Sequence, residues 1–190
     1  MGANPPGGKA WGEDRRLFAR YREDRGIAGA TGALRPGGDT LEAFAEADVA
    51  EVEEYVRSCG FYHSKARDIV ACANVLLEKY GGELPRTMEE LTALPGVGRK
   101  TANLILGDVF KVPGSTVVDT HCIRISNLLG LVDDLKDPVK IEMELRKILP
   151  PEHSSDFCHC IVLHGRAVCI ARRPGCERCC IRHLCRHYSG

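Results

Sequence analysis

The stretch LPGVGRKT, residues 94–101, lies between two short segments of helical periodicity. Its two glycines, Gly96 and Gly98, let the backbone turn sharply and bring N–H groups close to a partner. The next helix is expected to begin at this turn, so its unpaired N–H groups and the positive end of its dipole face the same partner. That geometry suits a phosphate oxygen and carries no base-sequence information. A plain helix–helix turn is the alternative, and the Arg-Lys-Thr after the glycines favours phosphate binding.

Helical periodicity extends to both sides of this turn. Apolar spacing predicts helices over residues 40–59, 65–80, 87–94, 119–129, 137–149 and 155–164, and another directly after Gly98. Thr87, Asp119 and Asp137 are residue types that prefer the N-cap position, and glycines follow the first two helices. No segment shows the alternation of a half-buried strand. The sequence therefore predicts an all-α protein without internal repeats.

Composition and charge limit the function classes. The 190 residues are 44% hydrophobic and 27% charged, which is ordinary globular usage and excludes wholesale disorder. No run approaches the roughly 18 apolar residues of a membrane span, and the opening MGANPPGGKAW lacks the apolar core of a signal peptide. We therefore expect a cytoplasmic protein without membrane contact. Because 26 basic residues balance 26 acidic ones, a nucleic-acid function has to rest on local basic patches.

The cysteines gather near the C-terminal end of the sequence, where seven of the ten lie between residues 158 and 185. In a chain that opens without a secretory leader, such crowding indicates metal ligands rather than disulfides. Cys169, Cys176, Cys179 and Cys185 supply four thiolates, the ligand set of an all-cysteine zinc site or of a 4Fe–4S cluster. Their spacing matches neither a zinc ribbon nor the bacterial ferredoxin run, and we favour iron–sulfur over zinc.

Three regions are expected along the chain. Residues 1–39, rich in Gly, Pro, Ala and Arg, are predicted to be a divergent or disordered segment with one short helical candidate around Arg15–Tyr21. Residues 40–150 are predicted to be a helical domain that contains the glycine turn. Residues 151–190 hold the last long helix and the cysteine cluster.

The segment LPGVGRKTAN, residues 94–103, resembles the helix-hairpin-helix of the endonuclease III family of DNA glycosylases. The likeness continues through VDTH at 118–121 and HGR at 164–166 into the cysteine cluster, and back to FYHSKA at 61–66. It covers roughly residues 40–188. The resemblance implies a two-lobed helical glycosylase fold. It also implies a monomeric, nucleoid-associated DNA glycosylase/AP lyase that acts on oxidised pyrimidines or abasic sites in duplex DNA.

The same resemblance implies the catalytic residues. Taken alone, Lys100 is most simply a solvated lysine and Asp119 a helix cap. In the family, the lysine of the GVGRK motif attacks the sugar carbon that bears the damaged base, and the aspartate of VDTH assists. By resemblance Lys100 is the nucleophile and Asp119 its electrostatic and proton-transfer partner. Relatives without lyase activity carry another residue at this lysine position, so Lys100 indicates the bifunctional class.

The resemblance also implies that the metal centre is a 4Fe–4S cluster, and the family spacing selects Cys179 over the adjacent Cys180. We assign this cluster no redox step in catalysis. The other cysteines are most simply buried small apolar residues: Cys59, Cys72, Cys122, Cys158 and Cys160.

DNA contacts are predicted at two places. The first is the glycine turn, with Leu94, Gly96, Val97, Gly98, Arg99 and Thr101. The second is Arg172 and Arg173, in the loop between the first two cluster ligands. Six arginines accompany a single acidic residue between residues 164 and 190. They either contact phosphates or partly neutralise the thiolates, and both roles are compatible.

Four side chains near these motifs are predicted to be structural. Phe61 and Tyr62 are expected to be core residues at a helix end rather than a platform for stacking bases. His121 and His164 are expected to be hydrogen-bonded structural histidines near the site, rather than ligands or bases.

The chain departs from the family pattern at its start. The family has an apolar helix there, followed by a glutamine that fills the gap left by the flipped base. Residues 1–39 show no such helix, and the sequence contains no glutamine. Either the N-terminus is divergent, or unrelated residues are joined to a truncated gene, and we favour the second explanation. A non-catalytic DNA-binding remnant of the fold is therefore the alternative function, and a zinc-stabilised interaction module is a third.

Overall fold

The computed structural model describes residues 40–189, which form helices and connecting turns and contain no strand. The all-α prediction is confirmed for this part of the chain. No helix among these residues is both long and apolar enough to cross a bilayer. They form two compact units, 40–83 and 84–189, so the boundary falls within the segment 40–150 that the sequence grouped together. The predictions for residues 1–39 lie outside the described residues.

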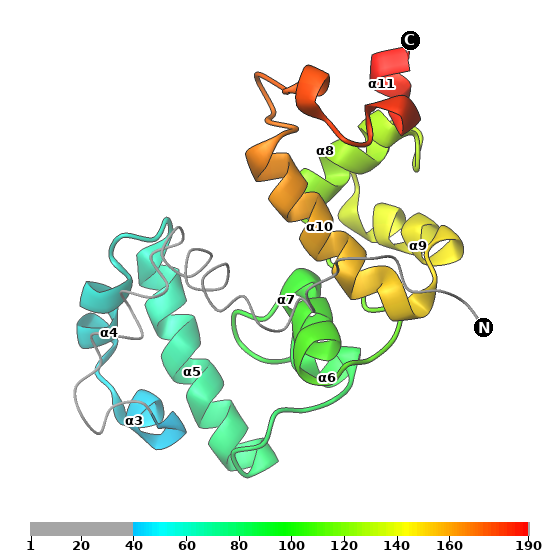
Figure 1. Cartoon of the computed structure of the whole chain (residues 1–190). Coiled ribbons are helices and arrows are strands. Elements are labelled where there is room, and N and C mark those ends of the chain that lie inside the picture. Colours follow the sequence, from blue (N-terminus) through cyan, green and yellow to red (C-terminus); the bar gives the residue numbers. More distant parts are fainter. Residues whose placement is uncertain (1–39, 190) are drawn as a thin grey trace, which may run out of the picture. The chain divides into compact units, whose positions relative to one another are not determined.

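The first unit consists of two short helices packed on one long helix (Figure 1). α3 (Leu41–Glu46) and α4 (Val49–Val56) both contact α5 (Tyr62–Tyr80). Gly81 ends α5 with φ 61°, a left-handed conformation that favours glycine. The core of this unit is small and apolar, and its buried members are Val52, Val56 and Ala66.

The single helix predicted over residues 40–59 is wrong, because the chain breaks after α3. Ala47 is extended, and Asp48 Oδ1 accepts a hydrogen bond from the N–H of Ala50 at 2.8 Å. Aspartate competes for backbone N–H groups in this way and starts a new helix. The apolar spacing continues across the break, which is why periodicity alone did not reveal it.

The position of Phe61, which precedes α5, also differs from the prediction. Its side chain is 88% exposed, so its assignment to the core is wrong. Its backbone is left-handed, with φ 58°, a conformation that bulky residues rarely adopt. Tyr62 does pack against the core of the first unit. Because the chain enters α5 through a left-handed residue, the Phe61 side chain does not continue the apolar face of the helix.

The second unit contains the remaining helices (Figure 1). They are α6 (Met88–Thr92), α7 (Arg99–Leu104), the π-helical turn η1 (Ile105–Val109), α8 (Thr120–Leu129), α9 (Pro138–Ile148), α10 (Ser154–Ala167) and α11 (Arg186–Ser189), with 3₁₀ turns η2 (Pro151–His153), η3 (Cys176–Arg178) and η4 (Arg182–Leu184). The N-caps predicted at Thr87, Asp119 and Asp137 are confirmed, because each side chain accepts a backbone N–H two or three residues later. The π-helical turn that continues α7 was not predicted.

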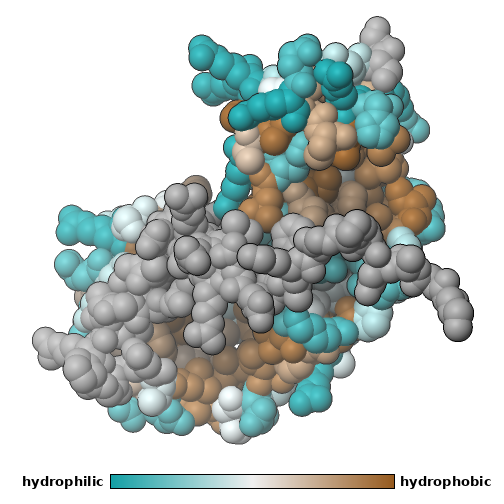
Figure 2. All heavy atoms as spheres, viewed as in Figure 1, coloured by the Kyte–Doolittle hydropathy of each residue, from teal (hydrophilic) through white to brown (hydrophobic). Residues whose placement is uncertain are grey.

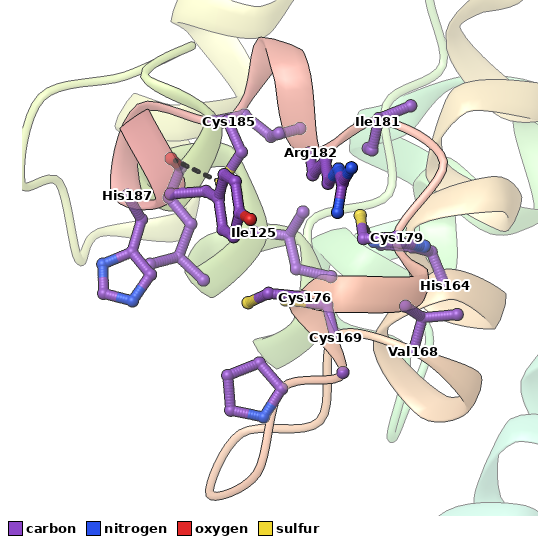
Figure 3. A pocket seen from close by; sticks show the side chains of 15 residues that line it. Ile125, His164, Val168, Cys169, Cys176, Cys179, Ile181, Arg182, Cys185 and His187 are labelled. Atoms are coloured by element: carbon purple, nitrogen blue, oxygen red, sulfur yellow. Dashed lines mark hydrogen bonds between the residues drawn. The ribbon is translucent and has the colours of Figure 1, made fainter. Parts of the chain in front are cut away.

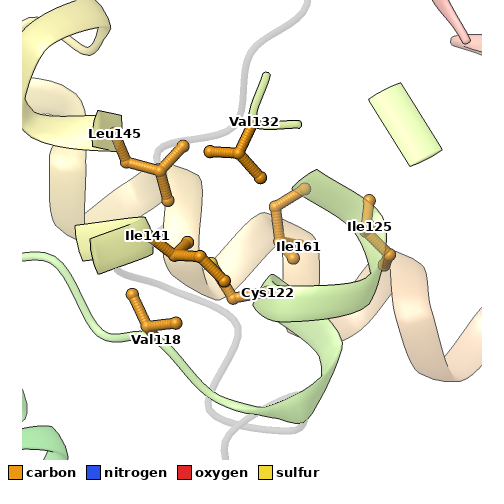
Figure 4. Packing of buried hydrophobic residues seen from close by; sticks show 7 residues of the cluster. All are labelled: Val118, Cys122, Ile125, Val132, Ile141, Leu145 and Ile161. Atoms are coloured by element: carbon orange, nitrogen blue, oxygen red, sulfur yellow. The ribbon is translucent and has the colours of Figure 1, made fainter. Parts of the chain in front are cut away.

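α8, α9 and α10 contribute to the main core of the second unit (Figure 4). Its buried members are Val118, Cys122, Ile125, Val132, Ile141, Leu145 and Ile161. α8 and α10 approach closely at Gly165, where an added Cβ would collide with His121 and crowd Ile125. The core therefore fixes the first turns of α8, the helix whose N-cap is Asp119.

Two residues of α9 test this core. Ile141 is 0% exposed, whereas Val139 is 44% exposed. We expect Ile141→Ala to lower the free energy of unfolding by about 2–5 kcal/mol, because the lost methylenes leave a cavity. Val139→Ala should change it by less than about 0.5 kcal/mol. Urea unfolding followed by circular dichroism measures both values, and equal losses would contradict this assignment of the core.

Candidate DNA-binding and catalytic site

α6 and α7 form the hairpin that the glycine turn predicts. Leu94 is buried, and its carbonyl accepts the N–H of Val97 at 3.1 Å, which closes the turn. Gly96 has φ 72°, in the left-handed region that side chains avoid. Gly98 is the N-cap of α7, and its carbonyl accepts the N–H of Ala102 at 2.9 Å. The second helix therefore begins at the end of the PGVG turn.

Gly98 lies at an open position of this turn. A Cβ added there would meet no atom within 4 Å, and its φ of −87° is allowed to any residue. Neither packing nor backbone conformation in the described part of the chain requires glycine at this position. The first N–H groups of α7 lie beside it and have no intrahelical acceptors. An open glycine next to unpaired N–H groups suits the close approach of an external anion.

Lys100 lies in the first turn of α7 and is exposed, and no described residue forms a hydrogen bond or ion pair with its amine. Asp119 is half-buried at the N-cap of α8, where one carboxylate oxygen accepts the N–H of Cys122 at 2.8 Å. Neither a hydrogen bond nor an ion pair joins Lys100 to Asp119 in the described residues. Any cooperation between them has to pass through a bound substrate.

Arg99, the neighbour of Lys100, is bound within the protein. Its Nε and Nη2 donate to the two carboxylate oxygens of Glu142 at 2.7 and 2.9 Å, which is a bidentate ion pair. These hydrogen bonds raise the pKa of Arg99. A phosphate contact of Arg99 would therefore use the guanidinium N–H groups that Glu142 does not occupy, or the backbone N–H.

The four predicted cluster cysteines line one recess (Figure 3). Cys169, Cys176, Cys179 and Cys185 are half-buried around about 440 Å³ of empty space, part of it open to solvent. In the described part of the chain, no three His, Cys, Asp or Glu side chains converge on a single ion. Four thiols around one recess are the ligand set of either a 4Fe–4S cluster or an all-cysteine zinc site.

Two side chains approach the sulfurs of this recess. Arg124 on α8 donates from Nη1 to Cys169 Sγ at 3.2 Å and from Nη2 to Cys169 O at 2.6 Å. His164 Nε2 lies 3.6 Å from Cys179 Sγ, as expected for a hydrogen-bonded structural histidine. Burial, and then the charge of Arg124, lower the pKa of His164. The hydrogen bond from Arg124 would stabilise negative charge on the Cys169 thiolate.

The choice between the adjacent Cys179 and Cys180 is supported by their positions. Cys179 lines the recess, whereas Cys180 is exposed and is not among its lining residues. In a segment without regular secondary structure, spacing does not predict which of two adjacent cysteine side chains faces inward. The family pattern was therefore needed to select Cys179.

The remaining cysteines follow the prediction only in part. Cys122 and Cys158 are buried, and the hydrogen bond that the Cys158 thiol donates to Cys122, together with burial, raises the pKa of Cys158. Cys59 and Cys72 are half-buried. Cys160 is exposed, so its assignment as a buried residue is wrong. It lies on the solvent side of α10, two residues from the buried Cys158.

Arginines gather at the C-terminal end of the second unit, where Figure 2 shows hydrophilic side chains at the top of the view. Arg172 and Arg173 are exposed and bond to no described residue. Arg178 and Arg182, in contrast, hydrogen-bond to groups of the same segment. Within this segment, Arg172 and Arg173 are therefore available to an external anion.

Arg124 and Glu142 were not predicted from the sequence. Their partners are 45 and 43 positions away in the sequence, so no local motif marks them. One signal was present for Glu142, because it stands between Ile141 and Leu145 on a predicted helix. A carboxylate close to the apolar face of a helix needs a buried cationic partner.

Known proteins resemble this chain in both sequence and structure. The profile of the "HhH-GPD superfamily base excision DNA repair protein" family matches residues 15–151. Endonuclease III of Synechocystis sp. is 41% identical over 169 residues, which cover 89% of this chain and 76% of that relative. The chain belongs to the endonuclease III family. Endonuclease III of Escherichia coli K12 is 39% identical over 171 residues, which cover 90% of this chain and 80% of the relative.

Solved structures of endonuclease III share the fold. A trapped endonuclease III–DNA covalent intermediate is 37% identical and superposes with a TM-score of 0.74, covering 92% of this chain and 74% of the other. A non-covalent endonuclease III–DNA complex is 36% identical and has a TM-score of 0.75. A thermostable thymine-DNA glycosylase, 20% identical with a TM-score of 0.70, shares the fold. The predicted helical glycosylase fold is confirmed.

The family match begins earlier than the motifs indicated. It starts at residue 15, so the expectation that the likeness begins near residue 40 is wrong. Residues 1–39 were set apart by their content of Gly, Pro, Ala and Arg, which does not report family similarity. The preference for unrelated residues joined to a truncated gene rested on that abrupt start and loses its support.

Replacing each of two adjacent cysteines tests the proposed ligand set. We expect Cys179→Ser to lose most of the iron and the broad visible absorbance of the purified protein, because the recess loses one thiolate. Cys180→Ser should retain both, because Cys180 lies outside the recess. Iron analysis and absorbance spectra make the measurement. Loss of iron from Cys180→Ser, with Cys179→Ser intact, would reverse the assignment.

Proposed function

We propose that the chain is a bifunctional DNA glycosylase and AP lyase of base excision repair. It acts as a monomer, at the nucleoid, on oxidised pyrimidines and abasic sites in duplex DNA. The observation that carries this proposal is the exposed, unbonded amine of Lys100 in the first turn of α7, directly after the open Gly98. A solved relative that is 37% identical is itself a trapped covalent intermediate with DNA, which supports covalent chemistry here.

Lys100 supplies the nucleophile. Its unprotonated Nζ attacks C1′ of the damaged nucleotide, and the bond from C1′ to the base breaks, so the base leaves with the bonding electron pair and takes up a proton. Opening of the sugar gives a Schiff base between Nζ and C1′. This imine acidifies the C2′ proton, and its removal expels the 3′ phosphate by β-elimination. Water then hydrolyses the imine and releases Lys100.

Asp119 supports the charged stages of this sequence. Its carboxylate is held by the N–H of Cys122, and no other hydrogen bond within the described residues occupies it. A fixed carboxylate near C1′ would stabilise the positive charge that develops on the sugar as the base departs. It also offers an oxygen to carry a proton between Lys100 and the leaving groups.

DNA is bound through its phosphates at two surfaces. The glycine turn presents the predicted contacts Leu94, Gly96, Val97, Gly98, Arg99 and Thr101. The open Gly98 and the unpaired N–H groups of α7 support this assignment. Arg172 and Arg173 form the second surface, because their guanidinium groups have no partner among the described residues. Phosphate contacts of this kind position the enzyme and do not read sequence.

A 4Fe–4S cluster is the metal centre that fits the recess. Cys169, Cys176, Cys179 and Cys185 would hold it, and Arg124 would offset part of its negative charge. When bound through these four cysteines, the cluster would cross-link segments that have little helical structure of their own. By holding those segments, the four cysteines keep the loop with Arg172 and Arg173 in place.

Borohydride trapping on a duplex with an abasic site tests Lys100. Borohydride reduces the Schiff base to a stable amine, so the wild-type protein should become covalently linked to the DNA. We expect Lys100→Ala to abolish the adduct and Lys111→Ala, a change at another exposed lysine of the second unit, to retain it. DNA binding without an adduct in the wild-type protein would favour the non-catalytic remnant instead.

The salt dependence of DNA binding tests Arg172 and Arg173. Each phosphate contact contributes about 0.9 to the slope of log K against log salt for duplex DNA. Replacing both arginines by Ala should therefore weaken binding to all sequences and lower the slope by about 1.8. Arg182→Gln, at an arginine that pairs with Glu177, should leave the slope unchanged. An unchanged slope in the double variant would contradict the phosphate contacts.

A further inference from the structure

Glu142 on α9 is a buried carboxylate, with only 2% of its surface exposed. A buried charge is costly unless other charges and hydrogen bonds compensate it. Both oxygens of Glu142 are compensated. Oε2 accepts Arg99 Nε at 2.7 Å, and Oε1 accepts Arg99 Nη2 at 2.9 Å. Oε1 also lies 2.9 Å from Arg146 Nη2, as an ion pair. Two guanidinium groups thus share one carboxylate.

The same network reaches a second residue of α7. Arg146 Nη2 lies 3.2 Å from Oδ1 of Asn103, a side chain that is almost fully buried. Arg99 and Asn103 are four residues apart on α7, and Glu142 and Arg146 are four residues apart on α9. Residues at this spacing lie on one face of a helix, one turn apart. The two helices are therefore joined at two successive turns.

This double connection fixes the rotation of α7 about its own axis. Successive residues of a helix are turned by about 100°. Holding Arg99 and Asn103 against α9 therefore sets the direction of Lys100, which points to solvent. α7 is short, with six residues before the π-helical turn, and it also packs against α6. A bidentate Arg–carboxylate pair restrains direction better than a single contact does.

We propose that Glu142 is a positioning residue for the Lys100 amine. Its carboxylate locks the rotation of α7 on α9, so that Lys100 faces the DNA bound at the glycine turn. This inference rests on the proposed nucleophilic role of Lys100. Under this proposal Arg99 also has a positioning function, through its bidentate pair with Glu142, in addition to a phosphate contact.

The first test compares three variants of α9. Glu142→Gln keeps the size of the side chain but leaves Arg99 and Arg146 without a counter-charge. Glu144→Gln is the matched control, because Glu144 is more exposed and pairs with Lys147 on the same helix. Leu145→Ala is the control for stability, since Leu145 is fully buried in the core but bonds to no residue of α7.

The rate of borohydride trapping is measured at saturating abasic duplex, at a temperature where each variant is folded, and Kd is measured separately. Misplacing a reacting group by about 1 Å costs on the order of 100-fold in rate. We expect Glu142→Gln to trap about 10- to 100-fold more slowly with little change in Kd. The two controls should trap at close to the wild-type rate. A loss in Leu145→Ala equal to that in Glu142→Gln would make the effect one of stability and overturn the proposal.

Arg99→Lys provides a second variant that does not remove the buried carboxylate. Lysine keeps the positive charge near DNA but cannot form the two-pronged pair. Positioning through Glu142 predicts slow trapping in this variant too. Wild-type trapping by Arg99→Lys would mean that only charge matters at residue 99, which would overturn the proposal even where Glu142→Gln does not fold.

Hydrogen–deuterium exchange gives a result that does not depend on the chemistry. Glu142→Gln should raise exchange across residues 99–109, and Glu144→Gln should leave it unchanged. Failure of the wild-type protein to be trapped would refute the proposed function. Unchanged exchange across residues 99–109 in Glu142→Gln would refute the positioning role of Glu142. The two failures are therefore distinguishable.

Discussion

The left-handed backbone at Gly96 is the constraint on which the functional part of the second unit depends. With φ 72° this position admits glycine without strain, and the turn then closes through the hydrogen bond from Val97 to Leu94. That closure makes α7 begin at Gly98, with its first N–H groups unpaired and Lys100 in its first turn. One backbone conformation thereby presents the proposed anion-binding groups and the proposed nucleophile together.

The formal net charge of the chain is zero, but its buried and its exposed charged groups differ in their partners. The charge of the buried Glu142 is neutralised by Arg99 and Arg146, and the sulfur of Cys169 accepts a hydrogen bond from Arg124. Arg172 and Arg173 bond to no described residue. Paired charges in the interior fix the geometry of helices, whereas unpaired cations on the surface attract phosphate. A neutral protein can in this way bind a polyanion, because attraction depends on where the unpaired cations lie.

The sequence predicted the parts of the site that local rules determine. The glycine turn, the N-caps at Asp119 and Asp137 and the C-terminal cysteines follow from spacing and residue type, and the family likeness gave Lys100 and Asp119 their roles. The break at Asp48 was missed because apolar periodicity continues across it. Phe61 was misplaced because a left-handed residue changes the direction of the side chain without changing the pattern. The pairing of Arg99 with Glu142 spans 43 positions, a contact that tertiary packing alone creates.

We propose that one amine of this protein, Lys100, bonds covalently to deoxyribose. Peptide mapping of the borohydride-reduced protein–DNA adduct by mass spectrometry tests it most directly, after nuclease digestion of the DNA. The account predicts that the sugar remnant lies on the peptide that contains the GVGRK motif, with fragment ions that place it on Lys100 and block tryptic cleavage there. A remnant on any other lysine, or on the terminal amine, would contradict the account.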